Sequence, residues 1–160
     1  MKTLFILRHA KSSWDNADSA DFDRPLNKRG LETAPLVGEI IRQNNFQIDS
    51  IISSPAKRAG QTAILVREAA QIKAEILFND RIYEANPHRL LQIASELDDE
   101  IAAPMFVGHN PGLEGLIKML TEETEPMPTA ALAVIDLKID NWKSIHIDCC
   151  NLRTIIRPKD

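Results

Sequence analysis

The chain has 160 residues, of which 44% are hydrophobic, 26% charged and 5% aromatic. This length fits one domain, and the composition is close to that of average globular proteins, which argues against a disordered, fibrous or coiled-coil chain. The net charge of −4 argues against nucleic acid as a partner, and no apolar run approaches the roughly 20 residues that span a membrane. No secretory leader with an apolar core of roughly 7–15 residues is visible. We therefore expect one domain over 1–160, in the cytoplasm.

Short apolar strands alternate with helical segments along the chain. In chain order the sequence predicts a strand over 3–7, a helix over 28–44, a strand over 48–53, a helix from 54–55 to about 70, a short edge strand over 75–78, a helix over 87–97, a strand over 104–107, a helix over 111–120, and two closing strands over 131–138 and 144–150 joined by a turn at 139–141. Pro35 and Gly38 predict a kink or a break inside the first helix.

This alternation favours an α/β fold, a three-layer sandwich in which a mostly parallel sheet is flanked by helices. The closing strands have no helix between them, so they predict an antiparallel element at one edge. Cys149 and Cys150 are adjacent, which suits reduced thiols near the end of the last strand better than a disulfide framework.

Cationic or imidazole side chains follow three of the predicted strands. Arg8 and His9 come after the first strand, Arg58 lies just beyond the second, and His109 follows the strand over 104–107. Ligands of open α/β sheets bind outside the carboxyl ends of the strands, so these side chains should converge in one crevice. Lys11 and Lys57 should add positive charge there.

Two of these turns also predict helix starts. Ser54 and Asn110 are suitable N-caps, and Pro55 and Pro111 then occupy the first helical position. The free amide groups of two helix N-termini would therefore point at the same sheet edge as the arginines. Together these features predict a phosphate site.

The histidines suggest which chemistry follows. A neutral imidazole is a good nucleophile near pH 7, and a phosphoryl group held by two arginines offers an electrophilic phosphorus atom. The sequence has neither a P-loop nor a carboxylate cluster for magnesium. A two-step transfer through a phosphohistidine, without metal or other cofactor, is the simplest consistent mechanism.

Three segments carry a family resemblance. Residues 7–14 (LRHAKSSW), 54–62 (SPAKRAGQT) and 107–112 (VGHNPG) resemble the signatures of the histidine phosphatase superfamily, in order. With residues 23–30, the first is most similar to the small SixA-type phosphohistidine phosphatases. The resemblance runs from residue 4 to about 134 and implies a phosphoglycerate mutase-like fold. The short stretch between Arg58 and His109 leaves little room for a cap insertion.

The resemblance also implies roles for individual residues. His9 would be the nucleophile, Arg8, Arg58 and His109 would bind and polarise the phosphoryl group, and Glu84 is the candidate general acid. If the substrate is itself a phosphohistidine, such an acid matters less, because imidazole is a less basic leaving group than an alkoxide. Two departures from the mutase pattern, Ala10 for glycine and Asp15 for asparagine, argue against mutase activity.

The leading hypothesis is therefore a metal-independent phosphatase, with a phosphorylated protein bearing phosphohistidine as its partner and neither nucleic acid nor membrane. One alternative is a phosphomonoesterase for a small phosphate ester, such as a sugar phosphate. Another is a module that binds phosphohistidine without hydrolysing it. His9 and His109 could also be structural histidines or a metal pair, and Glu84 could be an ordinary loop carboxylate.

Overall fold

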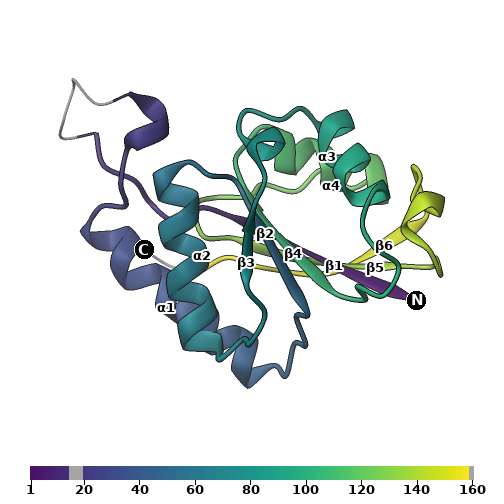
Figure 1. The fold of residues 1–160 in the computed structure, drawn as a ribbon, viewed down its shortest axis with the longest axis horizontal. Helices are drawn as coiled ribbons and strands as arrows, with labels where there is room; N and C mark the ends of the chain where they lie inside the picture. The colour runs from purple at the N-terminus through teal and green to yellow at the C-terminus, as the bar shows by residue number, and fades with distance from the viewer. Residues whose placement is uncertain (15–19, 159–160) are drawn as a thin grey trace.

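The computed structural model describes residues 1–14 and 20–158, in which six strands form one sheet in the order β3-β2-β4-β1-β5-β6 (Figure 1). The strands are β1 (Lys2–Arg8), β2 (Ser50–Ser53), β3 (Ile76–Phe78), β4 (Pro104–Gly108), β5 (Leu132–Leu137) and β6 (Cys150–Ile156). β3, β2, β4 and β1 pair in parallel, whereas β5 pairs antiparallel with both β1 and β6. The predicted mostly parallel sheet with an antiparallel edge is confirmed.

Helices cover both faces of the sheet (Figure 1). They are α1 (Lys28–Gln43), α2 (Lys57–Ala70), α3 (Pro87–Ser95) and α4 (Gly112–Thr121), and short 3-10 turns occur at η1 (Asp21–Asp23), η2 (Asp80–Ile82) and η3 (Trp142–Ser144). Successive strand residues point to opposite faces, so Leu4 and Ile6 of β1 pack with α3 and α4, while Phe5 and Leu7 pack with α1 and α2. The result is the predicted three-layer sandwich with two apolar cores.

The expected break in α1 does not occur, because the helix is continuous from Lys28 to Gln43. Pro35 leaves the carbonyl of Leu31 without an intrahelical donor, but Leu31 is exposed, so solvent can satisfy that group. Gly38 has a packing role instead. A Cβ there would lie 2.6 Å from both the Ala69 Cβ and the Val66 carbonyl oxygen, so glycine permits the close approach of α1 and α2.

The last strand was predicted wrongly at 144–150, since β6 is Cys150–Ile156. Asn141 instead caps η3, where its side-chain oxygen accepts from the Ser144 amide, and Trp142 is completely buried. Asp148 has a φ of 67°, which a strand does not accommodate. Cys149 and Cys150 therefore lie at the beginning of the strand rather than near its end, and both are buried free thiols.

The helix starts at the sheet edge were also predicted slightly wrongly. α2 begins at Lys57 after Ala56, and α4 begins at Gly112 after Pro111, so Ser54 and Asn110 are not their N-caps. Between α2 and β4 the chain forms only β3, η2 and α3, which leaves no large insertion over the sheet edge. In the described part of the chain, no helix has the length and apolarity needed to cross a membrane.

Candidate active site

A cavity of about 750 Å³ opens where the carboxyl ends of the parallel strands meet. Four of the five predicted site residues line it: Arg8, His9, Arg58 and His109. Arg8 and His9 come from the end of β1, Arg58 from the first turn of α2, and His109 from the residue after β4. The topology therefore brings together side chains that are up to about a hundred residues apart in the chain.

The backbone holds His9 firmly at the end of β1. Its amide donates to the Gly108 carbonyl (3.1 Å), its own carbonyl accepts from the Ala130 amide (3.0 Å), and the side chain is only 6% exposed. The His9 Nδ1 atom lies 2.7 Å from the carbonyl oxygen of Ala10. Because a carbonyl only accepts, this contact assigns the proton to Nδ1 and leaves the lone pair on Nε2. Nε2 is therefore the nucleophilic atom.

The surroundings keep both histidines uncharged. Burial is the largest cause that lowers the pKa of His9, to about 3, and the nearby His109, Arg58 and Arg8 act in the same direction. Burial likewise lowers the pKa of His109 to about 4, again assisted by Arg58. At neutral pH both imidazoles are neutral, as nucleophilic attack by His9 requires.

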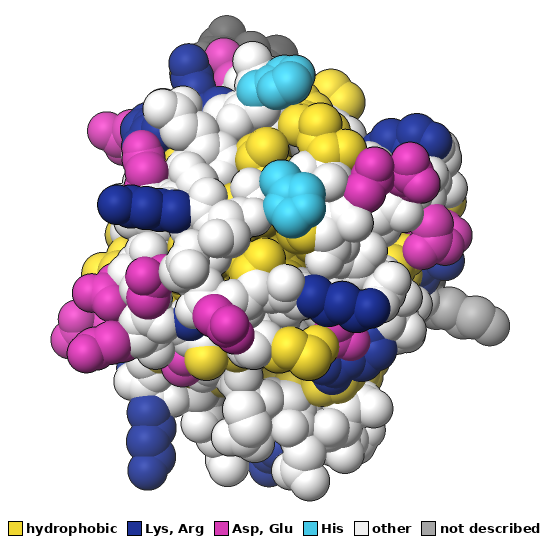
Figure 2. Space-filling view, turned by 90° about the vertical axis from the view of Figure 1, so that its right-hand side faces the viewer, with side chains coloured by type: hydrophobic (Ala, Val, Ile, Leu, Met, Phe, Trp, Pro, Cys, Tyr) yellow, Lys and Arg dark blue, Asp and Glu magenta, His cyan; other side chains and the backbone are white. Residues whose placement is uncertain are grey.

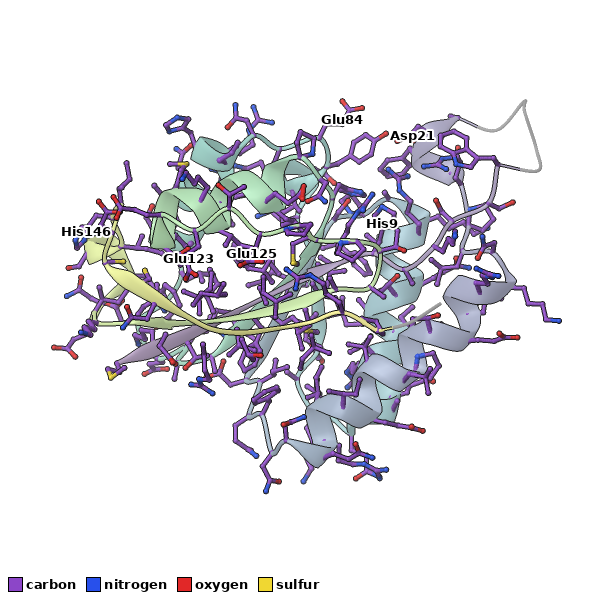
Figure 3. All side chains as sticks on the ribbon, turned by 180° about the vertical axis from the view of Figure 1, so that it is seen from behind. His9, Asp21, Glu84, Glu123, Glu125 and His146 are labelled. Carbon is purple, nitrogen blue, oxygen red and sulfur yellow. The ribbon has the colours of Figure 1, made fainter. Side chains whose placement is uncertain are left out.

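Arg58 is held by a network that the sequence did not indicate. Its Nε atom lies 3.4 Å from the His9 Nε2, its Nη1 donates to the Asp21 carbonyl (2.7 Å), and its Nη2 donates to the Asp21 carboxylate (3.1 Å). The Tyr83 hydroxyl donates to the same carboxylate oxygen at 2.6 Å. Figure 3 shows Asp21 close to His9, on the segment that contains η1.

These contacts shift the pKa values of Asp21 and of Tyr83, which donates to Asp21. The hydrogen bond from Tyr83, followed by the charge of Arg58, lowers the pKa of Asp21. Burial and the Asp21 carboxylate raise the pKa of Tyr83 to about 12. Asp21 therefore stays an anion that orients the Arg58 guanidinium. The only sequence signal was that Asp21 precedes the 23–30 segment and that Tyr83 precedes Glu84.

The second motif also ties α2 to the nucleophile. The Ala10 amide donates to the Thr62 hydroxyl (2.9 Å), and that hydroxyl donates to the Arg58 carbonyl (2.7 Å). Thr62 is fully buried, so a single hydroxyl fixes the residue after His9 against the first turn of α2. This contact explains why a small polar residue stands four positions after Arg58.

Two lining residues have buried nitrogens without a partner in the described part of the chain, Arg8 Nε and His109 Nδ1. The Nε2 of His109 lies 2.7 Å from the Ser54 hydroxyl, which itself accepts from the Ala56 amide. If the Ser54 hydroxyl donates to Nε2, the proton of neutral His109 lies on Nδ1. In that tautomer His109 Nδ1, like Arg8 Nε, is an N–H donor of the kind that phosphoryl oxygens accept.

Two predicted contributors lie outside this arrangement. Glu84 is exposed, is not among the lining residues, and points away from His9 at the margin of the molecule (Figure 3). Its role as a general acid stays a prediction that this geometry does not support. Lys57 is also exposed and outside the lining, whereas Lys11 does line the cavity. Asp15 lies outside the described residues.

A mostly parallel sheet whose carboxyl edge presents a neutral imidazole beside two guanidinium groups defines an α/β protein suited to phosphoryl transfer. A sequence profile of the histidine phosphatase superfamily (branch 1) matches residues 4–103. The chain therefore belongs to this superfamily and is a histidine-type phosphatase.

Individual relatives are similar to the chain over most of its length. An uncharacterized protein of Mycobacterium tuberculosis is 29% identical over 157 residues, which cover 91% of this chain and 96% of that protein. The crystal structure of an Agrobacterium tumefaciens protein, provisionally called phosphohistidine phosphatase SixA, matches with a TM-score of 0.85 and 27% identity over 98% of both chains. The protein histidine phosphatase SixA complexed with tungstate has the same fold, with a TM-score of 0.83, 23% identity and 96% of both chains covered.

Proposed function

We propose that the protein hydrolyses phosphohistidine in proteins through a covalent phosphate on His9. One observation carries the choice of substrate. Among the described residues that line the cavity there are imidazole and cationic groups but no Asp or Glu. A cavity whose described lining offers no carboxyl acid suits a leaving group that needs little help from protonation, and imidazole is far less basic than the alkoxide of a phosphomonoester.

In the first step the lone pair of His9 Nε2 attacks the phosphorus atom. A nitrogen–phosphorus bond to His9 forms as the one to the substrate imidazole breaks, and the leaving nitrogen keeps the electron pair and takes a proton from solvent. Arg8 and Arg58 neutralise the charge on the phosphoryl oxygens. The Ala10 carbonyl holds the Nδ1 proton while the His9 ring becomes positive.

In the second step a water molecule attacks the same phosphorus atom. The bond to His9 Nε2 breaks, inorganic phosphate leaves, and the imidazole regains its lone pair. The missing insertion between α2 and β4 supports access by a phosphoryl group that is attached to a protein surface.

The test compares a phosphohistidine peptide with a panel of small phosphomonoesters that includes sugar phosphates, with a chelator present. We expect the highest kcat/KM for the peptide, undiminished by the chelator, and a loss of at least about a thousandfold in His9→Ala. A sugar phosphate as the best substrate would favour the small-molecule alternative. Tight peptide binding without turnover would favour a binding module.

A further inference from the structure

The cavity carries more positive charge than one phosphoryl group requires. Its lining includes six cations: Arg8, Lys11, Arg24, Lys28, Arg29 and Arg58. Arg8 and Arg58 are assigned to the phosphoryl group, which leaves four cations without a role in the proposed reaction. The whole chain has a net charge of −4, so this concentration of cations is local.

The start of α1 is fastened to the segment that follows the nucleophile. The Asn27 amide donates to the Lys11 carbonyl (3.0 Å), and Ser12 and Leu26 form an antiparallel bridge. A Cβ on Gly30 would lie 2.1 Å from the Lys11 carbonyl oxygen, so only glycine permits this approach. The first turn of α1 is thus held at a fixed place beside the residues that follow His9.

Arg24 is held in a defined position next to this turn. The side chain is 9% exposed, its Nε donates to the Asp21 carboxylate at 3.2 Å, and the guanidinium carbon lies 3.4 Å from the centroid of the Trp14 ring. Stacking on an aromatic ring and an ion pair together fix the plane of the guanidinium. Arg24 is therefore ordered before any ligand binds.

Lys28 and Arg29 occupy positions that do not favour helix stability. They are exposed in the first turn of a 16-residue helix whose first turn contains no acidic residue. The positive end of the helix dipole disfavours cations at these positions. Their charge adds to that of the helix end, which makes this side of the cavity attractive to an anion.

From these observations we propose that Arg24, Lys28 and Arg29 form a second anion subsite, which binds carboxylate side chains adjacent to the phosphohistidine of the substrate. The inference rests on the proposed function and specifies its substrate class: an acidic peptide segment around the phosphorylated histidine. In the sequence, Lys11 lies between His9 and Arg24, two residues after His9. The phosphoryl group and the flanking carboxylates would occupy the same cavity together.

The test uses two phosphohistidine peptides that differ only in glutamate or glutamine on either side of the phosphorylated residue. Their binding to the His9→Ala protein, measured by calorimetry, reports recognition without turnover. We expect the glutamate peptide to bind about three- to tenfold tighter. In the His9→Ala background, K28A/R29A should reduce this ratio to near one. The matched control K138A/K143A removes two exposed lysines at the opposite end of the sheet and should leave the ratio unchanged.

The outcomes separate this inference from the proposed function. Equal binding of the two peptides overturns the subsite, and so does a ratio that K28A/R29A leaves unchanged or that both double variants reduce alike. Turnover of either peptide by the unmodified protein is a separate measurement that concerns His9 chemistry. A protein that discriminates the peptides without hydrolysing them would retain the subsite and lose the proposed hydrolysis.

Discussion

The strand β1 has a cation at each end, and the two are treated differently. Lys2, at the amino end, is buried, and its ammonium group donates to the carbonyl oxygens of Asp99 and Ile101 and lies 5.7 Å from the Trp142 ring centroid. Arg8, at the carboxyl end, has a buried Nε without a partner in the described part of the chain. The Lys2 ammonium group therefore stabilises the fold, whereas Arg8 retains an N–H group that can donate to a ligand.

The surfaces around the two ends of β1 also differ in how their charged side chains are arranged. On the face at the amino end of β1, basic and acidic side chains are interspersed around apolar ones (Figure 2). Figure 3 places His146 at that far end, away from His9. At the carboxyl end, cations gather in one cavity without a carboxylate among its described lining residues. The two cations of β1 therefore differ in one respect: backbone carbonyls bind the Lys2 ammonium group, whereas the Arg8 Nε has no partner among the described residues.

The largest effect should come from the amino end of the sheet. Trp142→Ala removes a completely buried ring whose Nε1 donates to the Ile101 carbonyl at 2.8 Å, so it should cost about 3–5 kcal/mol of stability. Urea unfolding measures this loss. The kcat/KM of the folded fraction should stay unchanged, and an activity loss beyond the unfolded fraction would contradict the separation of the two ends.

The next effect should come from the carboxyl end. Arg58→Ala removes the guanidinium beside His9 Nε2, and we expect kcat/KM to fall by about a hundred- to a thousandfold. Steady-state kinetics on an aryl phosphate measure it. Arg153→Ala, which breaks an exposed ion pair with Asp136, is the control and should have little effect. A decrease in kcat/KM of less than fivefold in Arg58→Ala would show that Arg58 does not stabilise the reacting phosphoryl group.

The stability of the protein should depend on the two site histidines in acid. Burial lowers the pKa of His9 to about 3 and of His109 to about 4, from an ordinary value of 6.5. Below pH 6.5 the unfolded chain takes up protons that the folded protein does not. The free energy of unfolding therefore decreases as pH falls from 6.5 toward these values, by at most about 1.4 kcal/mol per pH unit for each histidine.

Urea unfolding at several pH values tests this dependence. His9→Gln removes one of the two buried imidazoles, so it should make the fall in the free energy of unfolding between about pH 6 and 4 less steep. An identical slope in the His9 variant and the unmodified protein would show that His9 is not held neutral by burial.

The smallest effect should come from the hydroxyl that supports Asp21. Tyr83→Phe keeps the ring that packs edge-on against Phe22 and His109 and removes only the hydrogen bond to the carboxylate. With a lost hydrogen bond of about 0.5–1.5 kcal/mol, kcat/KM should fall by about two- to tenfold. A variant with unchanged kinetics would show that Arg58 does not need Tyr83 for its orientation.

Much of the fold could be predicted because it depends on local patterns. The apolar runs predicted β1, β2, β3 and β4, and their alternation with helices predicted a mostly parallel sheet. The errors occurred where tertiary contacts decide the outcome. Gly38 is typical of a helix break, yet it lies in a continuous helix because it packs closely against α2. Residues 144–150 are typical of a strand, yet η3 extends to Ser144 and Asp148 has a φ of 67°.

Part of the site could also be predicted from the sequence. Arg8, His9, Arg58 and His109 directly follow strands or begin a helix, so the topology rule alone brought them together. The network around Arg58 was not predictable, because Asp21, which binds Arg58, and Tyr83, which binds Asp21, are 62 residues apart and meet only in the folded protein. Their residue types are common in loops, and no spacing distinguishes them.

The most direct test of the central claim is to trap the phosphorylated intermediate. The protein is mixed with a radiolabelled phosphoryl donor, quenched in alkali within milliseconds, and digested for peptide mapping. We expect label on the peptide that contains His9, stable in alkali and lost in acid, and no label on the His9→Ala protein. Full turnover without label on His9, or label on another residue, would show that His9 is not the nucleophile.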